Sequence, residues 1–295
     1  MAKIGRFRND ASREAFLRAY TEAEALWPLP ATTSDIETSF GSTHVRRSGT
    51  GDGTPIVLLH NFGGNGLTWY QVVEDFARNR VVYALDTVGT ASRSVQTAPL
   101  AKESDFAAWL QQVLDALGLE RVHLIGYSHG AWHTAAVALH DSRRLASITL
   151  IEPGGVLTKP EWKILWKMVQ FGMKGKSDAN LRAMMEWLSP GVELTPLQAA
   201  LVKPAIEYRM KIGWARVLKD AELQSITVPT LVIFGGESLV AHPEVAGARI
   251  AEHLPHGETV TYPGVGHGLL FQIPDQIAAR TLEFIEQHED APATR

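Results

Sequence analysis

The residues 126–130 read Gly-Tyr-Ser-His-Gly, have the form G-x-S-x-G and centre on Ser128. They follow an apolar run at 122–125 and precede a helical pattern at 131–140, which predicts a sharp strand-to-helix turn. In such a turn the glycines occupy positions where a β-carbon would clash, and the serine hydroxyl stands at the helix N-terminus. The pattern therefore favours a nucleophilic serine over a structural turn of small residues.

A serine hydroxyl is a poor nucleophile at neutral pH and needs a base within hydrogen-bond reach. His267 is the best candidate, because it lies in a glycine-rich loop, 263–268, directly after the last expected strand. The small residues beside it allow this loop to approach Ser128. His129 and His133 are four residues apart, as in some metal sites, but no glutamate lies between them in the zinc-binding pattern. We therefore expect no metal and no cofactor.

Two main-chain N–H groups are expected to stabilise the negative charge that develops on a substrate oxygen. One belongs to His129, the residue after the nucleophile. The second is expected in the loop after the strand at 56–59, which reads His60-Asn61-Phe62-Gly63-Gly64. Phe62 is the candidate donor by its position, although a glycine-rich loop is also how any sharp chain reversal is made.

Six short apolar runs alternate with helical patterns and predict the strands that must position these residues. Nearly continuous apolar runs are typical of strands buried on both faces, so they favour an α/β fold with a mostly parallel central sheet flanked by helices. The runs lie at 56–59, 81–85, 122–125, 147–151, 230–234 and 259–262. A stretch rich in threonine and valine at 36–47 predicts a hairpin at one edge of the sheet.

The alternation fails between 151 and 230, where tryptophan and methionine residues lie in helical stretches broken at Pro190 and Pro204. We expect a helical lid over the C-terminal ends of the strands, where ligands bind in open α/β sheets. The expected division is an N-terminal helical extension at 1–35, a core at 36–155 and 225–290, and a helical cap at 156–224.

The composition argues against several classes of function. Lys and Arg total 28 against 32 Asp and Glu, a net charge of -4, so we expect no nucleic-acid partner. The chain has no cysteine, which excludes disulfides and thiolate catalysis within it. No apolar run approaches the ~18 residues of a membrane span. We expect a cytoplasmic monomer or homodimer that acts on a small-molecule substrate.

The chain resembles α/β-hydrolases, and among them bacterial serine carboxylesterases. The resemblance covers nearly the whole chain after about residue 35, and it is carried by the segments 60–64, 85–94, 126–130, 231–235 and 264–268. It implies a serine hydrolase that cleaves carboxylic esters of a partly hydrophobic small molecule through an acyl-enzyme. A carbon–carbon bond hydrolase acting on a diketone would use the same serine site. A hydrolase-fold module that binds a ligand without turnover is the other alternative.

The acid that orients the histidine is assigned through this resemblance. In most such hydrolases a carboxylate follows the strand that here is 231–234, in a pattern such as G-E-x-D, but this chain has Ser238 at that position. Glu152 is our first choice, because its spacing from Ser128 is similar to that in haloalkane dehalogenases, whose acid follows the earlier strand. Glu237, one position before Ser238, is the second choice, and a site without an acid or otherwise arranged is the third.

Contacts with the substrate are expected from two places. His60 and Asn61 lie in the loop of the expected oxyanion donor, and Trp162, Trp166 and Trp187 lie in the lid. Aromatic and methionine side chains form adaptable apolar walls around a ligand. Most of the lid's aromatic and methionine side chains are nevertheless expected to pack within the lid, because helical stripes usually bury against their neighbours.

Overall fold

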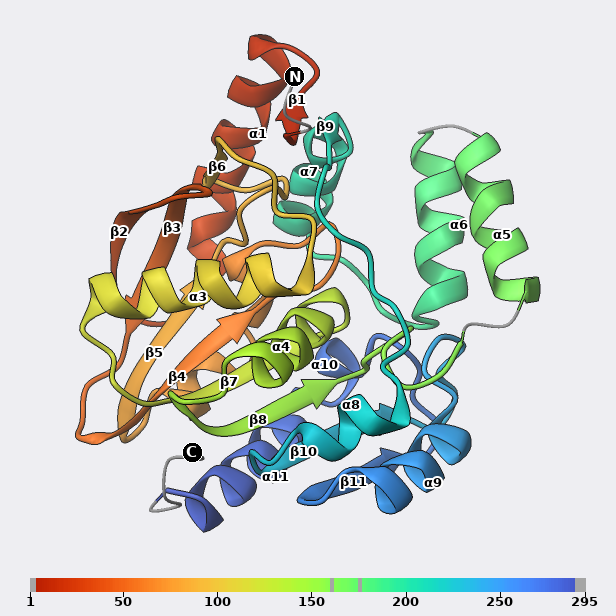
Figure 1. Cartoon of the computed structure of the whole chain (residues 1–295). Coiled ribbons are helices and arrows are strands. Elements are labelled where there is room, and N and C mark those ends of the chain that lie inside the picture. The colour runs from red at the N-terminus through yellow and green to blue at the C-terminus, as the bar shows by residue number, and fades with distance from the viewer. Residues whose placement is uncertain (1–3, 160–161, 175–176, 290–295) are drawn as a thin grey trace.

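The computed structural model describes residues 4–159, 162–174 and 177–289. Within these residues a nine-stranded sheet lies between two layers of helices (Figure 1). Its strands are β2 (Ala31–Thr38), β3 (Gly41–Ser48), β4 (Gly53–Leu59), β5 (Arg80–Leu85), β6 (Val95–Gln96), β7 (Val122–Tyr127), β8 (Leu145–Ile151), β10 (Thr230–Gly235) and β11 (Gly257–Tyr262). Their spatial order is β11-β10-β8-β7-β4-β5-β3-β2, and β6 pairs with β3.

The helices cover both faces of this sheet. They are α1 (Asp10–Ala23), α2 (Val73–Phe76), α3 (Glu103–Leu117), α4 (His129–His140), α5 (Trp162–Met173), α6 (Asp178–Leu188), α7 (Pro196–Ala205), α8 (Asp220–Ser225), α9 (Pro243–His253), α10 (Leu269–Gln272) and α11 (Pro274–Gln287), with 3-10 turns at Glu24–Leu26 and Gly66–Trp69. One hydrophobic core joins the sheet to α3, α4, α8 and α9, and a second joins its other face to α1, α2, α10 and α11.

The apolar runs form strands that are buried on both faces of the sheet, because successive side chains of a strand point to opposite faces. In β4, Ile56 and Leu58 enter one core, and Val57 and Leu59 enter the other; all four are 0% exposed. All six predicted strands are present. The pairs from β11 through β5 are parallel, so the predicted mostly parallel sheet is confirmed.

The expected hairpin is present, but two of the expected boundaries fall inside elements of the structure. The antiparallel pair β2–β3 lies at the sheet edge as predicted, but it begins at Ala31, so the boundary expected at residue 35 falls inside a strand. The N-terminal helix α1 packs on the main body, as its apolar spacing predicted, and Phe16 and Tyr20 are fully buried there. At the other boundary, Leu223 of α8 packs in the core, so the core begins before residue 225. Local patterns did not show where the edge strand and this part of the core begin.

The segment between β8 and β10 divides into two parts. Helices α5 and α6, drawn in green in Figure 1, stand to one side of the sheet, and Phe171 packs against Trp187 with ring centroids 5.5 Å apart. Helix α7 instead packs against α1. A short strand, β9 (Tyr208–Arg209), pairs with β1 (Arg6–Phe7), which no local pattern predicted. Among the described residues, no helix has both the length and the apolar character that crossing a membrane requires.

Candidate active site

Ser128 lies in a strained turn between β7 and α4. Its φ is +55° and its ψ is −112°, a conformation that side chains rarely adopt. A β-carbon on Gly126 would lie 2.3 Å from the carbonyl oxygen of Gly130, and one on Gly130 would lie 2.1 Å from that of Leu59. Only glycine fits at these two positions, as the sequence predicted. The Ser128 N–H donates to the Ile151 carbonyl at 2.8 Å, which fixes the turn to β8.

Ser128, His267 and Glu152 form one hydrogen-bonded chain. The Ser128 Oγ lies 2.9 Å from His267 Nε2, and His267 Nδ1 lies 2.9 Å from Glu152 Oε2. An ionised carboxylate only accepts hydrogen bonds, so Nδ1 carries the proton. In the neutral ring Nε2 is then free to accept from the serine hydroxyl. The structure thus brings together the three residues that we expected, in the tautomer that a general base requires.

Glu152 is fully buried, and three hydrogen-bond donors surround its carboxylate. Oε1 accepts from the Gly235 N–H at 2.6 Å, and Oε2 accepts from the Ser238 hydroxyl at 2.6 Å as well as from His267. A buried carboxylate needs such partners to offset its lost hydration. The parallel register of β8 and β10, which pairs Ile151 with Ile233, brings Glu152 beside these donors.

Glu237, the second-choice acid, lies differently. Its side chain is exposed, and its main-chain N–H donates to the Val265 carbonyl at 2.9 Å. The carboxylate that contacts His267 is therefore the one of Glu152. Ser238 was not among our site residues, because the sequence showed this position only as one where the usual carboxylate is missing.

Tyr127 supports His267 from the side of the sheet. Its hydroxyl donates to the His267 carbonyl oxygen at 2.7 Å, and the two rings stack with centroids 5.8 Å apart. Burial, and then the nearby Glu152 carboxylate, raises the pKa of the Tyr127 phenol. The phenol therefore keeps its proton and, as a hydrogen-bond donor, holds the loop 263–268 that carries His267. This loop is called the histidine loop below.

The two residues with the expected oxyanion donors place their side chains in one aromatic cluster. Within the described residues, the main-chain N–H groups of Phe62 and His129 donate to no protein acceptor. The Phe62 ring, 48% exposed, stacks on Trp214 at 5.2 Å and meets the His129 ring edge-on at 5.8 Å. Trp214 was not among our site residues, because in the sequence it was one of many aromatic residues between the fourth and fifth core strands.

The His129 side chain adds no positive charge to the site. Burial is the largest effect and lowers its pKa to about 4, although the hydrogen bond to the Gly213 carbonyl opposes this. A neutral imidazole donates from Nε2 to that carbonyl at 3.2 Å. The contact joins the start of α4 to the segment that carries Trp214.

The expected substrate contact of His60 does not fit its position. The side chain is buried, and burial lowers its pKa, so the ring is neutral. Its Nδ1–H donates to the Asn61 carbonyl at 2.8 Å, and its Nε2 accepts from the Thr87 N–H at 3.1 Å. Both ring nitrogens are thus used inside the protein. His60 fixes the loop 60–64 to the loop after β5, and the prediction that it binds substrate is wrong.

The other expected substrate contacts stay predictions. The Asn61 Oδ1 accepts from the Thr68 hydroxyl at 3.2 Å, which holds the turn of the oxyanion loop. Trp187 on α6 packs against Phe171 on α5. Trp162 and Trp166 on α5 are 71% and 55% exposed, with no ring neighbour among the described aromatic contacts.

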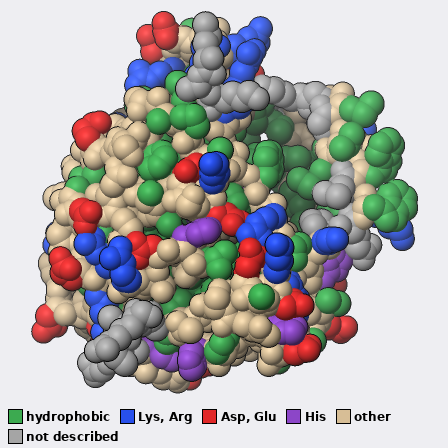
Figure 2. Space-filling view, viewed as in Figure 1, with side chains coloured by type: hydrophobic (Ala, Val, Ile, Leu, Met, Phe, Trp, Pro, Cys, Tyr) green, Lys and Arg blue, Asp and Glu red, His purple; other side chains and the backbone are tan. Residues whose placement is uncertain are grey.

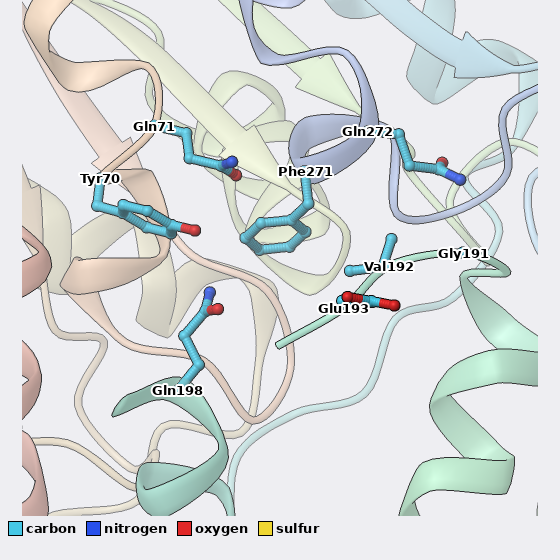
Figure 3. A pocket seen from close by; sticks show the side chains of 8 residues that line it. All are labelled: Tyr70, Gln71, Gly191, Val192, Glu193, Gln198, Phe271 and Gln272. Carbon is cyan, nitrogen blue, oxygen red and sulfur yellow. The ribbon is translucent and has the colours of Figure 1, made fainter. Parts of the chain in front are cut away.

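A polar pocket adjoins the histidine loop (Figure 3). Its volume is about 310 Å³, and it is lined by Tyr70, Gln71, Gly191, Val192, Glu193, Gln198, Phe271 and Gln272. The Phe271 ring contacts the Tyr127 ring edge-on, with centroids 6.1 Å apart. Tyr127 is the residue directly before Ser128. A β-carbon on Gly268 would lie 2.8 Å from Val192 Cγ2, so the chain after α6 lies directly over this loop.

Known proteins resemble this chain in sequence over most of its length. A family model described as alpha/beta hydrolase fold matches residues 54–183. The Carboxylesterase YbfK of Bacillus subtilis is 26% identical over 281 residues, which cover 92% of this chain and 93% of that protein. The uncharacterized carboxylesterase nap of the same organism is 27% identical and covers 91% of both chains.

Solved structures agree with this relationship. The crystal structure of carboxylesterase CesB (YbfK) from Bacillus subtilis superposes with a TM-score of 0.86 at 26% identity and covers 93% of this chain and 98% of that one. The naproxen esterase (carboxylesterase NP) of the same organism gives a TM-score of 0.85 at 26% identity and covers 92% and 97%. The chain therefore has the α/β-hydrolase fold and is a carboxylesterase-like hydrolase that resembles the bacterial carboxylesterases.

Proposed function

We propose that this protein hydrolyses carboxylic esters of a partly hydrophobic small molecule through an acyl-enzyme on Ser128. The observation that carries the proposal is the hydrogen-bonded chain from the Ser128 hydroxyl through His267 to the buried Glu152 carboxylate, with 2.9 Å at each step. Such a chain activates a serine, because the base removes its proton as the hydroxyl attacks.

In the first half-reaction the Ser128 oxygen attacks the ester carbonyl carbon and His267 Nε2 takes the hydroxyl proton. The carbonyl oxygen becomes an oxyanion that the N–H groups of Phe62 and His129 stabilise. The Glu152 carboxylate stabilises the imidazolium that forms. When the tetrahedral intermediate collapses, the proton passes from His267 to the alkoxide, and the alcohol leaves.

In the second half-reaction water replaces the serine hydroxyl as nucleophile. His267 takes a proton from the water, which attacks the acyl carbonyl and forms a second tetrahedral intermediate. Its collapse breaks the bond to the Ser128 oxygen and returns the proton to that oxygen. The products are a carboxylic acid and the free enzyme.

The aromatic cluster supports a partly hydrophobic substrate. Phe62, Trp214 and the neutral His129 ring lie together beside the expected oxyanion donors. Such side chains bury apolar groups at little cost in conformational freedom. One relative is a naproxen esterase, and naproxen is an aromatic carboxylic acid. We extend the same class, esters with an aromatic or alkyl acyl group, to this chain.

Hydrolysis of p-nitrophenyl butyrate by the purified protein tests the proposal. We expect saturable release of p-nitrophenol that Ser128→Ala reduces to the uncatalysed rate. A fluorophosphonate is expected to add its mass to the peptide that contains Ser128 in the parent protein but not in the variant. A protein that modifies at Ser128, ignores esters and cleaves a vinylogous diketone would be a carbon–carbon bond hydrolase instead. A protein that does neither and resists the reagent would be a binding module.

A further inference from the structure

Helix α5 has apolar side chains on two opposite faces. Toward α6, Phe171 is 6% exposed and packs against Trp187. On the opposite face a stripe recurs at positions i, i+4, i+7 and i+11, the spacing of one helix face. The side chains of this stripe are Trp162, Trp166, Val169 and Met173, which are 71%, 55%, 50% and 78% exposed.

Lysines follow this stripe along its length. Lys163, Lys167 and Lys174 each come one residue after a member of the stripe, and all three are exposed. The Lys167 ammonium lies over the Phe171 ring, 5.5 Å from its centroid, at the boundary of the face toward α6. Residues 162–174 contain no Asp or Glu, although the whole chain has a net charge of -4. Figure 2 shows hydrophobic side chains gathered at the outer edge of the cap, with basic side chains beside them. The stripe and these lysines together are called the α5 face below.

We propose that the α5 face lies on the surface of an anionic lipid membrane. Large aromatic side chains are rarely left exposed together in proteins that have no partner. Tryptophan beside lysine suits the boundary between acyl chains and charged headgroups, where the ring is buried and the ammonium group meets a phosphate. The charge of the lysines complements anionic headgroups. With 12 residues, the helix is too short to span a bilayer, so it lies in the plane of the interface.

This arrangement would bring the cap to the surface where apolar esters accumulate. The α5 face needs no contact with Ser128 or His267, so its binding to lipid does not depend on the proposed esterase activity. The two proposals can therefore fail separately: a protein without ester turnover can still bind vesicles, and an active esterase can remain in solution.

Co-sedimentation of the full-length protein with lipid vesicles tests the proposal. Vesicles of phosphatidylglycerol and phosphatidylcholine in equal parts are compared with vesicles of phosphatidylcholine alone. We expect binding to the anionic vesicles at low salt, at least about tenfold tighter than to the neutral ones, and weaker binding at high salt. The tryptophan emission should shift to shorter wavelength on binding, because Trp162 and Trp166 leave water.

Two pairs of variants separate the apolar and the charged contributions. Trp162→Ser with Trp166→Ser should lower vesicle binding at least about tenfold and abolish the emission shift. The control Val245→Ser, at a 63% exposed position on α9, should leave binding unchanged. Lys163→Glu with Lys167→Glu should lower binding to anionic vesicles about tenfold or more. The control Lys102→Glu with Lys211→Glu changes the net charge equally at exposed positions elsewhere and should have a much smaller effect.

Several outcomes would overturn the proposal. One is failure of the parent protein to sediment with anionic vesicles at low salt. Another is binding that the tryptophan substitutions leave unchanged. A concentration-dependent dimer that the same substitutions abolish would assign the α5 face to a second copy of this chain. A higher KM for dissolved esters in the tryptophan variants, without vesicle binding by the parent, would assign it to the substrate.

Discussion

Ser238 donates a hydrogen bond of 2.6 Å to Oε2 of Glu152, the same oxygen that accepts from His267. The Ser238 Oγ in turn lies 3.2 Å from the Ala241 N–H, which donates to it, so the hydroxyl proton points toward the carboxylate. The serine therefore stands where the resemblance led us to expect a carboxylate, and it holds a carboxylate that arrives from the neighbouring strand. It acts on the reaction only through Glu152, as a positioning residue.

Replacing Ser238 by alanine should lower kcat about tenfold while KM stays within about twofold. A hydrogen bond to a charged group contributes about 1.5–3 kcal/mol, and part of it is lost from the orientation of the carboxylate toward the imidazolium. Steady-state kinetics with p-nitrophenyl butyrate would measure the effect. Ser238→Thr keeps a hydroxyl at this position and should retain most of the activity. Equal losses in both variants would point to packing rather than to the hydrogen bond.

Replacing Glu152 by glutamine should lower kcat by about a thousandfold or more, because the variant keeps the shape but loses the charge that stabilises the imidazolium. The amide can also turn its NH2 group toward His267 and favour the wrong tautomer. Glu237→Gln is the matched control, since that side chain is exposed and outside the cluster. We expect it to stay within about twofold of the parent. The opposite result for the two variants would move the acid to Glu237.

A carboxylate at position 238, after β10, should be able to replace the carboxylate of Glu152, which follows β8. In Glu152→Ala the space of the lost side chain lies next to Ser238, whose Oγ was 2.6 Å from the carboxylate. Adding Ser238→Asp places a carboxylate one bond farther into this space, toward His267. We expect the double variant to recover at least about tenfold in kcat over Glu152→Ala alone. If kcat does not recover although circular dichroism shows an intact fold, the His267 ring cannot reach a carboxylate at position 238.

The sequence predicted the strand-to-helix turn at Ser128, the six core strands and the histidine loop, because each depends on a local pattern of apolar runs and glycines. The choice between Glu152 and Glu237 could not be decided in this way, since both follow buried strands. It depended on the register that pairs Ile151 with Ile233. The role of His60 was missed for a similar reason. A histidine in a glycine-rich loop has no local feature that shows whether its ring points to the substrate or to Thr87.

Acid should destabilise the fold through its buried histidines. His123 is fully buried, its Nδ1 lies 2.7 Å from the Ser147 hydroxyl, and burial is the largest cause that lowers its pKa to about 4, against the opposing effect of Glu289. Between the ordinary histidine pKa and this value the unfolded chain binds a proton that the folded protein excludes. The free energy of unfolding therefore rises with pH across this range and falls on acidification.

Urea unfolding at pH 7.5 and pH 5.0 measures this effect for His123→Gln, a variant that keeps a polar group near Ser147. The contribution of His123 to the loss between these pH values should be about 2 kcal/mol, and the variant should lose less stability than the parent by that amount. Identical losses in the two proteins would mean that other groups control the acid response.

Trp214 should matter for esters with an aromatic acyl group. It is 70% exposed, yet its ring stacks on Phe62, whose main-chain N–H is an expected oxyanion donor. Removing an aromatic contact costs about 0.5–1.5 kcal/mol, so Trp214→Ala should raise KM about two- to tenfold for a naphthyl or phenylpropionyl ester. KM for p-nitrophenyl acetate should hardly change. Val245→Ala, at an exposed apolar position on α9, is the control for the assay with dissolved esters. If kcat falls for both esters while KM stays constant, the stack with Trp214 holds the oxyanion loop in place, and the aromatic surface is not the binding site for the acyl group.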